Sequence, residues 1–106
     1  RRKDIIKKSG ELISLAHIEN SALKIDHIKE VACIGIDDEV VGSKIIMFIV
    51  FNESLNCFNK IAEIKNKLKE NLKKIEMPDK FMPIPELPKT ESGKILKRVL
   101  IDNYIS

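Results

Sequence analysis

The most apolar stretch of the 106-residue chain constrains its fold more than any other feature. Residues 44–51 have the sequence KIIMFIVF, in which seven apolar side chains follow one lysine. The run is too short to cross a bilayer, which takes about 20 residues. It is rich in the β-branched and aromatic residues that favour strands. Since consecutive apolar positions require burial on both faces, we predict a central strand covered on each side.

The segments before this strand predict a hairpin and a helix. Residues 4–7 and 12–13, which lie on either side of Ser9 and Gly10, predict a short hairpin, because a glycine suits the turn position. Ser14 is a suitable N-cap, and the apolar spacing that follows predicts an amphipathic helix over residues 14–24.

The remaining segments complete an α+β fold. Residues 28–36 predict a second strand, and residues 58–74 predict the longest helix, which Pro78 ends. Residues 81–84 include a proline and therefore predict an edge strand. A final helix beginning near Ile95 is expected to dock on the sheet. The order βαββαβα predicts a small sheet of short strands with about three packing helices.

Length and charge limit the classes of function. The chain has the length of one domain and enough apolar residues to be globular. Its net charge of +3 comes from 19 basic and 16 acidic residues that are interleaved along the sequence. No aromatic residues alternate with the lysines to stack on bases, so we expect a solvated surface and no nucleic-acid partner. No stretch is long enough for a transmembrane segment.

The cysteines and histidines lack the spacing of a metal site. Cys33 lies inside a predicted strand and Cys57 is far from it, so we expect two reduced thiols in a cytoplasmic protein. His17 and His27 fall on different elements, without the neighbouring ligands of a zinc site. We therefore predict that this chain binds no metal by itself.

Residues 85–98 run from a proline-rich segment into a Gly-Lys pair, with the sequence PELPKTESGKILKR. Pro88 restricts the backbone and turn-forming residues follow it, so Lys94 is a cation at the end of a tight loop, suited to an anion. A nucleotide P-loop is rejected, because Pro88 replaces its first glycine and Ile95 replaces the hydroxyl residue that binds magnesium. From the residues alone, a surface turn with a solvated lysine is the alternative.

Two segments resemble motifs of one enzyme superfamily. Residues 87–95, LPKTESGKI, resemble the last core motif of the adenylate-forming acyl-activating enzymes, which include acyl-CoA synthetases, acyl-acyl-carrier-protein synthetases and adenylation domains. Residues 1–13, RRKDIIKKSGELI, resemble the hinge motif of that family, without the glycine that usually precedes its arginine. The resemblance implies that residues 1–106 are the single, mobile C-terminal lid domain. The large N-terminal domain that binds ATP and the acyl group would lie outside this chain, which we expect to be a fragment or a cleaved product.

The resemblance implies a two-step reaction and a role for five residues. A carboxylate attacks the α-phosphate of ATP to give an acyl-adenylate and pyrophosphate, and a thiol then displaces AMP to give a thioester. Lys94 would be the catalytic cation and nucleotide contact of the first step. Arg1 would contact the nucleotide phosphates, and Lys3 would be the hinge about which the domain alternates. Gly10 would flank the passing pantetheine arm, with Lys7 as a second contact.

The implied cofactors are ATP with Mg, bound mainly by the large domain, and CoA or the phosphopantetheine of an acyl carrier protein. The implied partners are that large domain and a carboxylic acid, with a fatty acid favoured. Many CoA-using members carry a basic residue where this chain has Leu12, and the hairpin sequence is closer to the acyl-acyl-carrier-protein synthetase branch. The choice of acceptor remains open. The expected location is cytoplasmic, with any membrane association left to other parts of the parent protein.

Three further interpretations concern secondary positions. Residues 17–19, HIE, stand where the family often has EIE, and we interpret them as helix surface and packing. Lys97 and Arg98 either contact the acceptor or form a solvated helix end, and the second reading is favoured. The alternative function, from another class, is a standalone interaction module that keeps the fold and binds an acidic protein. Such a module would need neither Gly10 nor Lys94.

Overall fold

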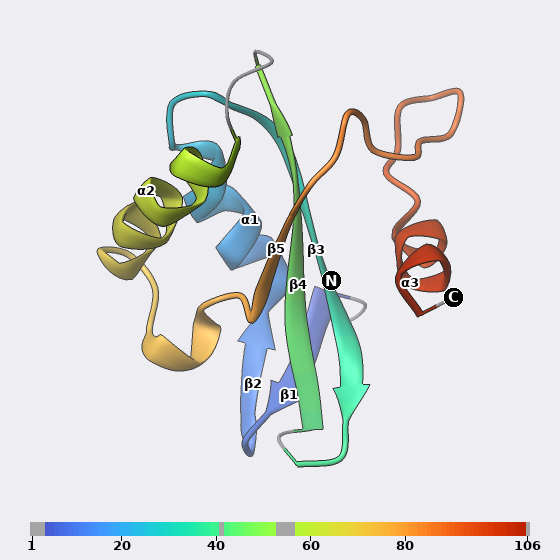
Figure 1. Ribbon diagram of the computed structural model, residues 1–106. Helices are drawn as coiled ribbons and strands as arrows, with labels where there is room; N and C mark the ends of the chain where they lie inside the picture. The colour runs from blue at the N-terminus through green and yellow to red at the C-terminus, as the bar shows by residue number, and fades with distance from the viewer. Residues whose placement is uncertain (1–3, 41, 53–56, 106) are drawn as a thin grey trace.

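The computed structural model describes residues 4–40, 42–52 and 57–105, with the side chains of residues 57–59 left aside. Over these residues the chain forms two sheets and three α-helices (Figure 1). The elements are β1 (Ile5–Lys8), β2 (Glu11–Ser14), α1 (Leu15–Leu23), β3 (Ile28–Asp38), β4 (Gly42–Phe51), α2 (Cys57–Lys69), the 3₁₀ helix η2 (Lys74–Glu76), β5 (Lys80–Pro83) and α3 (Lys97–Ile105). The predicted α+β fold is confirmed. No helix of the described residues is long and apolar enough to span a membrane.

Strand β4 is the centre of the larger sheet, as the apolar run predicted. It pairs antiparallel with β3 and parallel with β5, so the strand order is β3-β4-β5. β5 is an edge strand, where Pro83 is tolerated because its missing N–H faces no partner strand. β1 and β2 form a separate two-stranded hairpin.

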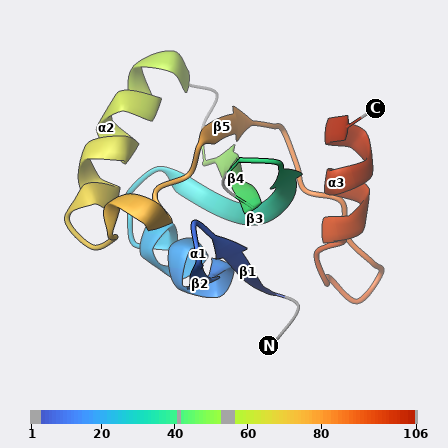
Figure 2. The same ribbon diagram turned by 90° about the horizontal axis from the view of Figure 1, so that it is seen from below.

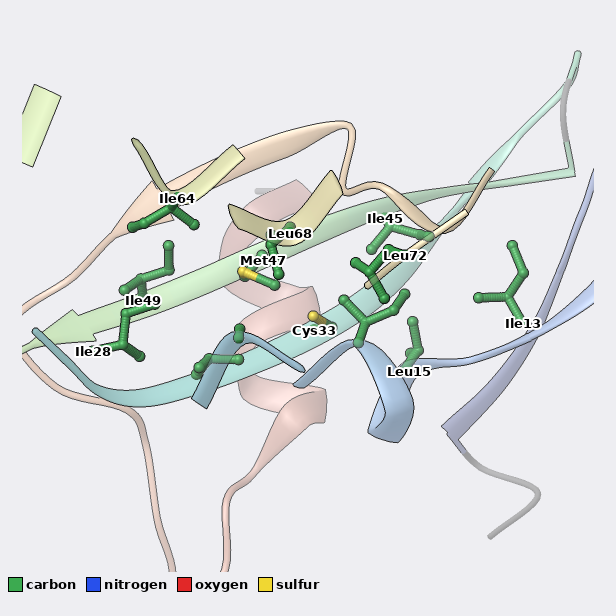
Figure 3. Packing of buried hydrophobic residues seen from close by; sticks show 13 residues of the cluster. Ile13, Leu15, Ile28, Cys33, Ile45, Met47, Ile49, Ile64, Leu68 and Leu72 are labelled. Atoms are coloured by element: carbon green, nitrogen blue, oxygen red, sulfur yellow. The ribbon is translucent and has the colours of Figure 1, made fainter. Parts of the chain in front are cut away.

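The two faces of this sheet support two different sets of elements. Figure 2 shows α2 and α3 on opposite sides of the sheet, with α1 and the hairpin below it in that view. Alternate residues of β3 and β4 enter two separate cores. The first core, on the α1 and α2 side (Figure 3), contains Ile13, Leu15, Ile18, Ala22, Ile28, Val31, Cys33, Ile45, Met47, Ile49, Ile64, Leu68 and Leu72. The second, under α3, contains Ala32, Ile34, Ile46, Phe48, Val50, Leu87 and Leu100.

Helix α2 ends earlier than its apolar spacing predicts. The predicted range of residues 58–74 is wrong at its C-terminal end, because the helix stops at Lys69. The carboxylate of Glu76 accepts the backbone N–H of Lys73 at 2.8 Å and starts η2 instead. Leu72 still packs into the first core from the connecting turn. The spacing therefore identified a buried residue correctly, although the backbone around it is not α-helical.

The helix α1 begins where the sequence predicted. Ser14 has extended backbone angles, and its hydroxyl accepts the N–H of His17 at 3.2 Å, which is the contact expected of an N-cap. Ile18 on this helix is completely buried. The neighbouring Glu19 accepts the backbone N–H of Cys33 at 2.8 Å and so joins α1 to β3. Residues 17–19 thus serve packing, as interpreted, and Glu19 also bonds across elements.

Cys33 is a free thiol in the middle of the first core, with no exposed surface. Burial, and to a smaller extent the charge of Glu19, raises the pKa of the Cys33 thiol far above its usual range, while Lys97 acts in the opposite direction. In the unfolded chain this thiol ionises near pH 8.5. Above that pH the folded state therefore binds more protons than the unfolded state, and stability falls as the pH rises.

We expect this effect to separate the wild-type chain from Cys33→Ala. Above about pH 8.5 the wild-type free energy of unfolding should fall by up to about 1.4 kcal/mol per pH unit more than that of the variant. Urea unfolding at pH 7, 9 and 10 measures the difference, and Cys57 is present in both proteins. Parallel pH curves would show that the buried thiol does not contribute.

Candidate functional site

The residues 89–95, here called the signature loop, form a closed turn that presents Lys94. Lys89 and Ile95 make an antiparallel bridge at its base. The N–H of Thr90 donates to the carbonyl of Lys94 at 2.9 Å, and the N–H of Lys94 donates to the Thr90 hydroxyl at 3.1 Å. Gly93 has a φ of +91°, a conformation that favours glycine. The backbone at Lys94 is therefore fixed by the loop itself.

The base of the signature loop is attached to the sheet. Leu87, just before it, is buried in the second core. Lys89 forms an ion pair with Glu30 on β3, and the N–H of Leu96 donates to the carbonyl of Pro88 at 2.9 Å. The Lys94 side chain is exposed, and it enters no ion pair or hydrogen bond with another side chain of the described residues. A fixed backbone and an exposed ammonium suit an anion supplied from outside the chain.

The β1–β2 turn presents Gly10. Ser9 and Gly10 both have positive φ angles, 49° and 84°, as a two-residue type I′ hairpin turn requires. A methyl group at Gly10 would find no atom within 4 Å in the described part of the chain, apart from its chain neighbours. Lys7 is exposed and pairs in register with Leu12, whose side chain is 76% exposed. The outer side of the hairpin thus combines a lysine and an uncovered leucine beside an open glycine.

The hairpin is fixed to the larger sheet by a lysine that the sequence analysis did not identify. Lys8 is buried, and its Nζ lies 2.8 Å from Oδ2 of Asp79. The same oxygen accepts the N–H of Ile45 on β4 at 2.8 Å. A methyl group at Gly42 would lie 2.9 Å from the carbonyl oxygen of Lys7, so this glycine allows the close approach of β1. The available sequence signal was strand alternation. Lys8 follows the exposed Lys7 directly, so its side chain falls on the opposite face of β1.

Lys97 has a different role from both that were considered. Its Nζ lies 2.9 Å from Oδ1 of Asp4 and 2.8 Å from Oε2 of Glu19. Burial by itself would lower the pKa of Lys97, but hydrogen bonds and charge attraction to Glu19 and Asp4 outweigh it and raise the pKa above its usual value. The solvated reading is therefore wrong for Lys97, because its ammonium is already bound by two carboxylates. Arg98 is exposed.

The sequence-predicted site residues do not form one cluster. In Figure 1 the Gly10 turn lies at the lower end of the molecule and the signature loop, drawn in orange-red, at the upper right. The chain therefore carries two separate candidate surfaces, one with Lys94 and the other with Gly10 and Lys7. Arg1 and Lys3 lie outside the described residues. Among those residues, no group of three metal-ligating side chains occurs.

Known proteins resemble the chain over almost its whole length. Acetyl-coenzyme A synthetase of Streptomyces avermitilis is 34% identical over 104 residues, which cover 96% of this chain. A 2-hydroxy-7-methoxy-5-methyl-1-naphthoate–CoA ligase of Streptomyces carzinostaticus is 30% identical over 102 residues, or 94% of the chain. The chain spans 16% and 18% of the lengths of these two relatives.

Solved structures of acyl-CoA synthetases also resemble the chain. A Mycobacterium tuberculosis fatty acyl CoA synthetase superposes with a TM-score of 0.86 at 30% identity, and a Brucella canis acyl-CoA synthetase with a TM-score of 0.89 at 27% identity. They match 98% and 99% of this chain, which covers 20% of each. Residues 17–94 also match the family model described as the AMP-binding enzyme C-terminal domain. The chain therefore belongs to the family of C-terminal domains of AMP-binding enzymes.

Proposed function

We propose that residues 1–106 are the mobile C-terminal domain of an ATP-dependent acid–thiol ligase, whose large N-terminal domain lies outside the chain. The observation that carries this proposal is Lys94, an exposed ammonium on a loop whose backbone is closed by hydrogen bonds. The family relationship supports it, since the relatives include CoA ligases. The chain by itself would be inactive, because the acyl pocket and most of the ATP site belong to the large domain.

In the first step, Lys94 would stabilise the meeting of two anions. The acyl carboxylate attacks the α-phosphate of ATP, and negative charge increases on the oxygens around phosphorus. A cation already held in place lowers this barrier because it needs no reorganisation during the reaction. The bonds between Thr90 and Lys94 supply that fixed position. We assign Mg and the remaining nucleotide contacts to the large domain, with Arg1 as an additional phosphate contact.

In the second step, the other surface of the domain would face the active site. The signature loop and the Gly10 turn lie far apart in Figure 1, so one orientation of the domain could present only one of them. We propose that rotation about Lys3 exchanges them. Gly10 then leaves room for a pantetheine arm, and Lys7 contacts it.

The acceptor and the acid are finer proposals. CoA is supported by the relatives, several of which are CoA ligases. The phosphopantetheine of an acyl carrier protein is supported by Leu12, an exposed apolar residue where many CoA-using members carry a basic one. We propose a fatty acid as the substrate, and a cytoplasmic location in keeping with the free thiol of Cys33.

The full-length protein tests this function. Acid-dependent ATP–pyrophosphate exchange is measured across a series from acetate to long-chain fatty acids, and thioester formation is measured with CoA and with holo-acyl carrier protein. We expect exchange with at least one acid and thioester on one of the two acceptors. Deleting residues 1–106 should remove thioester formation and strongly reduce exchange. If no acid supports exchange, or the deletion changes neither activity, the proposal is wrong.

A further inference from the structure

The ammonium of Lys97 is the meeting point of three segments that are far apart in the sequence. Asp4 belongs to the segment just before β1, Glu19 to helix α1, and Lys97 is the first residue of α3. Its two contacts of 2.9 and 2.8 Å are within the range of charge-assisted hydrogen bonds. The same Oε2 atom of Glu19 also accepts the N–H of Cys33 on β3. The cluster therefore connects four segments, three of them through the Lys97 cation and β3 through the carboxylate of Glu19.

The cluster lies directly beside the signature loop. Lys97 follows Lys94 by three residues, and the intervening Leu96 bonds through its N–H to the carbonyl of Pro88 at 2.9 Å. The loop is thus held by an ion pair at each end. Lys89 binds Glu30 on β3 before the loop, and Lys97 binds Asp4 and Glu19 after it.

The two attachments differ in what they join. The Lys89 pair fixes the loop to the sheet alone. The Lys97 cluster also includes Asp4, which directly follows the residue at the proposed hinge, Lys3. Lys97 is therefore separated from the proposed hinge residue by only Asp4 and one hydrogen bond, so a movement about that hinge would be passed directly to Lys97.

We propose that Lys97 is a positioning residue for Lys94. Lys97 joins the segment after the hinge to the signature loop, so that this segment and the loop move as one rigid body. This inference rests on the proposed function of Lys94 in adenylate formation. Removing the ammonium would leave the carboxylates of Asp4 and Glu19 close together without a cation, and their repulsion would separate them. The start of α3 would then lose its link to the N-terminal segment, and Lys94 would be displaced. A displacement of about 1 Å lowers a rate by about 10²-fold where geometry is critical.

The test uses Lys97→Met in the full-length enzyme, because methionine is unbranched, has an apolar side chain only one atom shorter than that of lysine, and carries no charge. We expect kcat for ATP–pyrophosphate exchange to fall about 10- to 100-fold, with KM for ATP changed less than about threefold. Thioester formation from supplied acyl-adenylate should stay within about twofold of wild type. This is expected because the turn end of the hairpin is fixed by Lys8 and Asp79 instead.

Three further variants make the result specific. Lys97→Arg keeps a cation between the carboxylates and should recover most of the exchange activity. Asp4→Asn keeps the pair between Lys97 and Glu19, so it should give a smaller loss in the same direction and serves if Lys97→Met does not fold. Lys67→Met removes a lysine paired with Glu63 on the surface of α2 and should change neither half-reaction.

The possible outcomes are distinct. If Lys97→Met and Asp4→Asn lower both half-reactions in proportion to a loss of folded protein, the cluster only stabilises the fold and the inference is wrong. If exchange survives in both variants while Lys94→Ala abolishes it, the inference fails and the proposed function stands. If Lys94→Ala also leaves exchange intact, the proposed function itself fails.

Discussion

Lys94→Ala in the full-length enzyme is expected to lower acid-dependent ATP–pyrophosphate exchange by about 10²- to 10³-fold. The reason is electrostatic, since the variant removes the exposed ammonium of Lys94 from a loop whose backbone is held by its own hydrogen bonds. The turn itself should survive, because both bonds between Thr90 and residue 94 use backbone atoms of residue 94. Exchange and thioester formation from supplied acyl-adenylate are measured separately, and only exchange should fall.

A matched control is available on the other side of the sheet. Lys69 is an exposed lysine in the last turn of α2, and Lys69→Ala removes the same charge from a surface without a proposed function. It should leave both half-reactions unchanged. If Lys94→Ala behaves in the same way as Lys69→Ala, the signature lysine has no catalytic role, and the interaction module becomes the better explanation of the chain.

Gly10→Ala is expected to have the opposite selectivity, with thioester formation slowed about 10- to 100-fold and exchange almost unchanged. Apart from its chain neighbours, the added methyl group meets no atom of the described residues within 4 Å, so we attribute a steric effect to a molecule that passes the turn. Forcing one extra carbon into a filled passage costs about 1–3 kcal/mol, which corresponds to that loss of rate. Acyl transfer from supplied acyl-adenylate to CoA and to holo-acyl carrier protein is measured.

Gly93→Ala is the matched control for backbone strain. Gly93 has a φ of +91° against +84° for Gly10, and beyond its chain neighbours its added methyl group also meets none of the described atoms within 4 Å. Both substitutions should therefore destabilise the fold by a similar amount, about 1–2 kcal/mol. Gly93 belongs to the signature loop, so its substitution should affect exchange and spare thioester formation. If the two variants impair both half-reactions equally, strain is the cause and Gly10 lines no passage.

The fold could be predicted in part from local patterns. The apolar run of residues 44–51 identified the central strand, because only a strand covered on both faces can bury consecutive apolar side chains. Ser14 and Gly10 identified a helix start and a hairpin turn through backbone chemistry that depends on few neighbours. The C-terminal end of α2 could not be predicted from the apolar spacing, since Leu72 is buried although it lies beyond the helix, where the bond from the N–H of Lys73 to Glu76 starts η2.

The sequence by itself determined the family and the position of Lys94, because both depend on short continuous motifs. It also determined the two-sided burial of β4. Only the tertiary structure decided what Lys8 and Lys97 do. Their partners, Asp79 for Lys8 and Asp4 and Glu19 for Lys97, are 71 and up to 93 residues away along the chain. A lysine's charge is visible in a sequence, whereas its partner depends on which distant segments the two cores bring together. For that reason the loop that carries Lys94 could be predicted from the sequence, whereas the ion pairs of Lys8 and Lys97 could not.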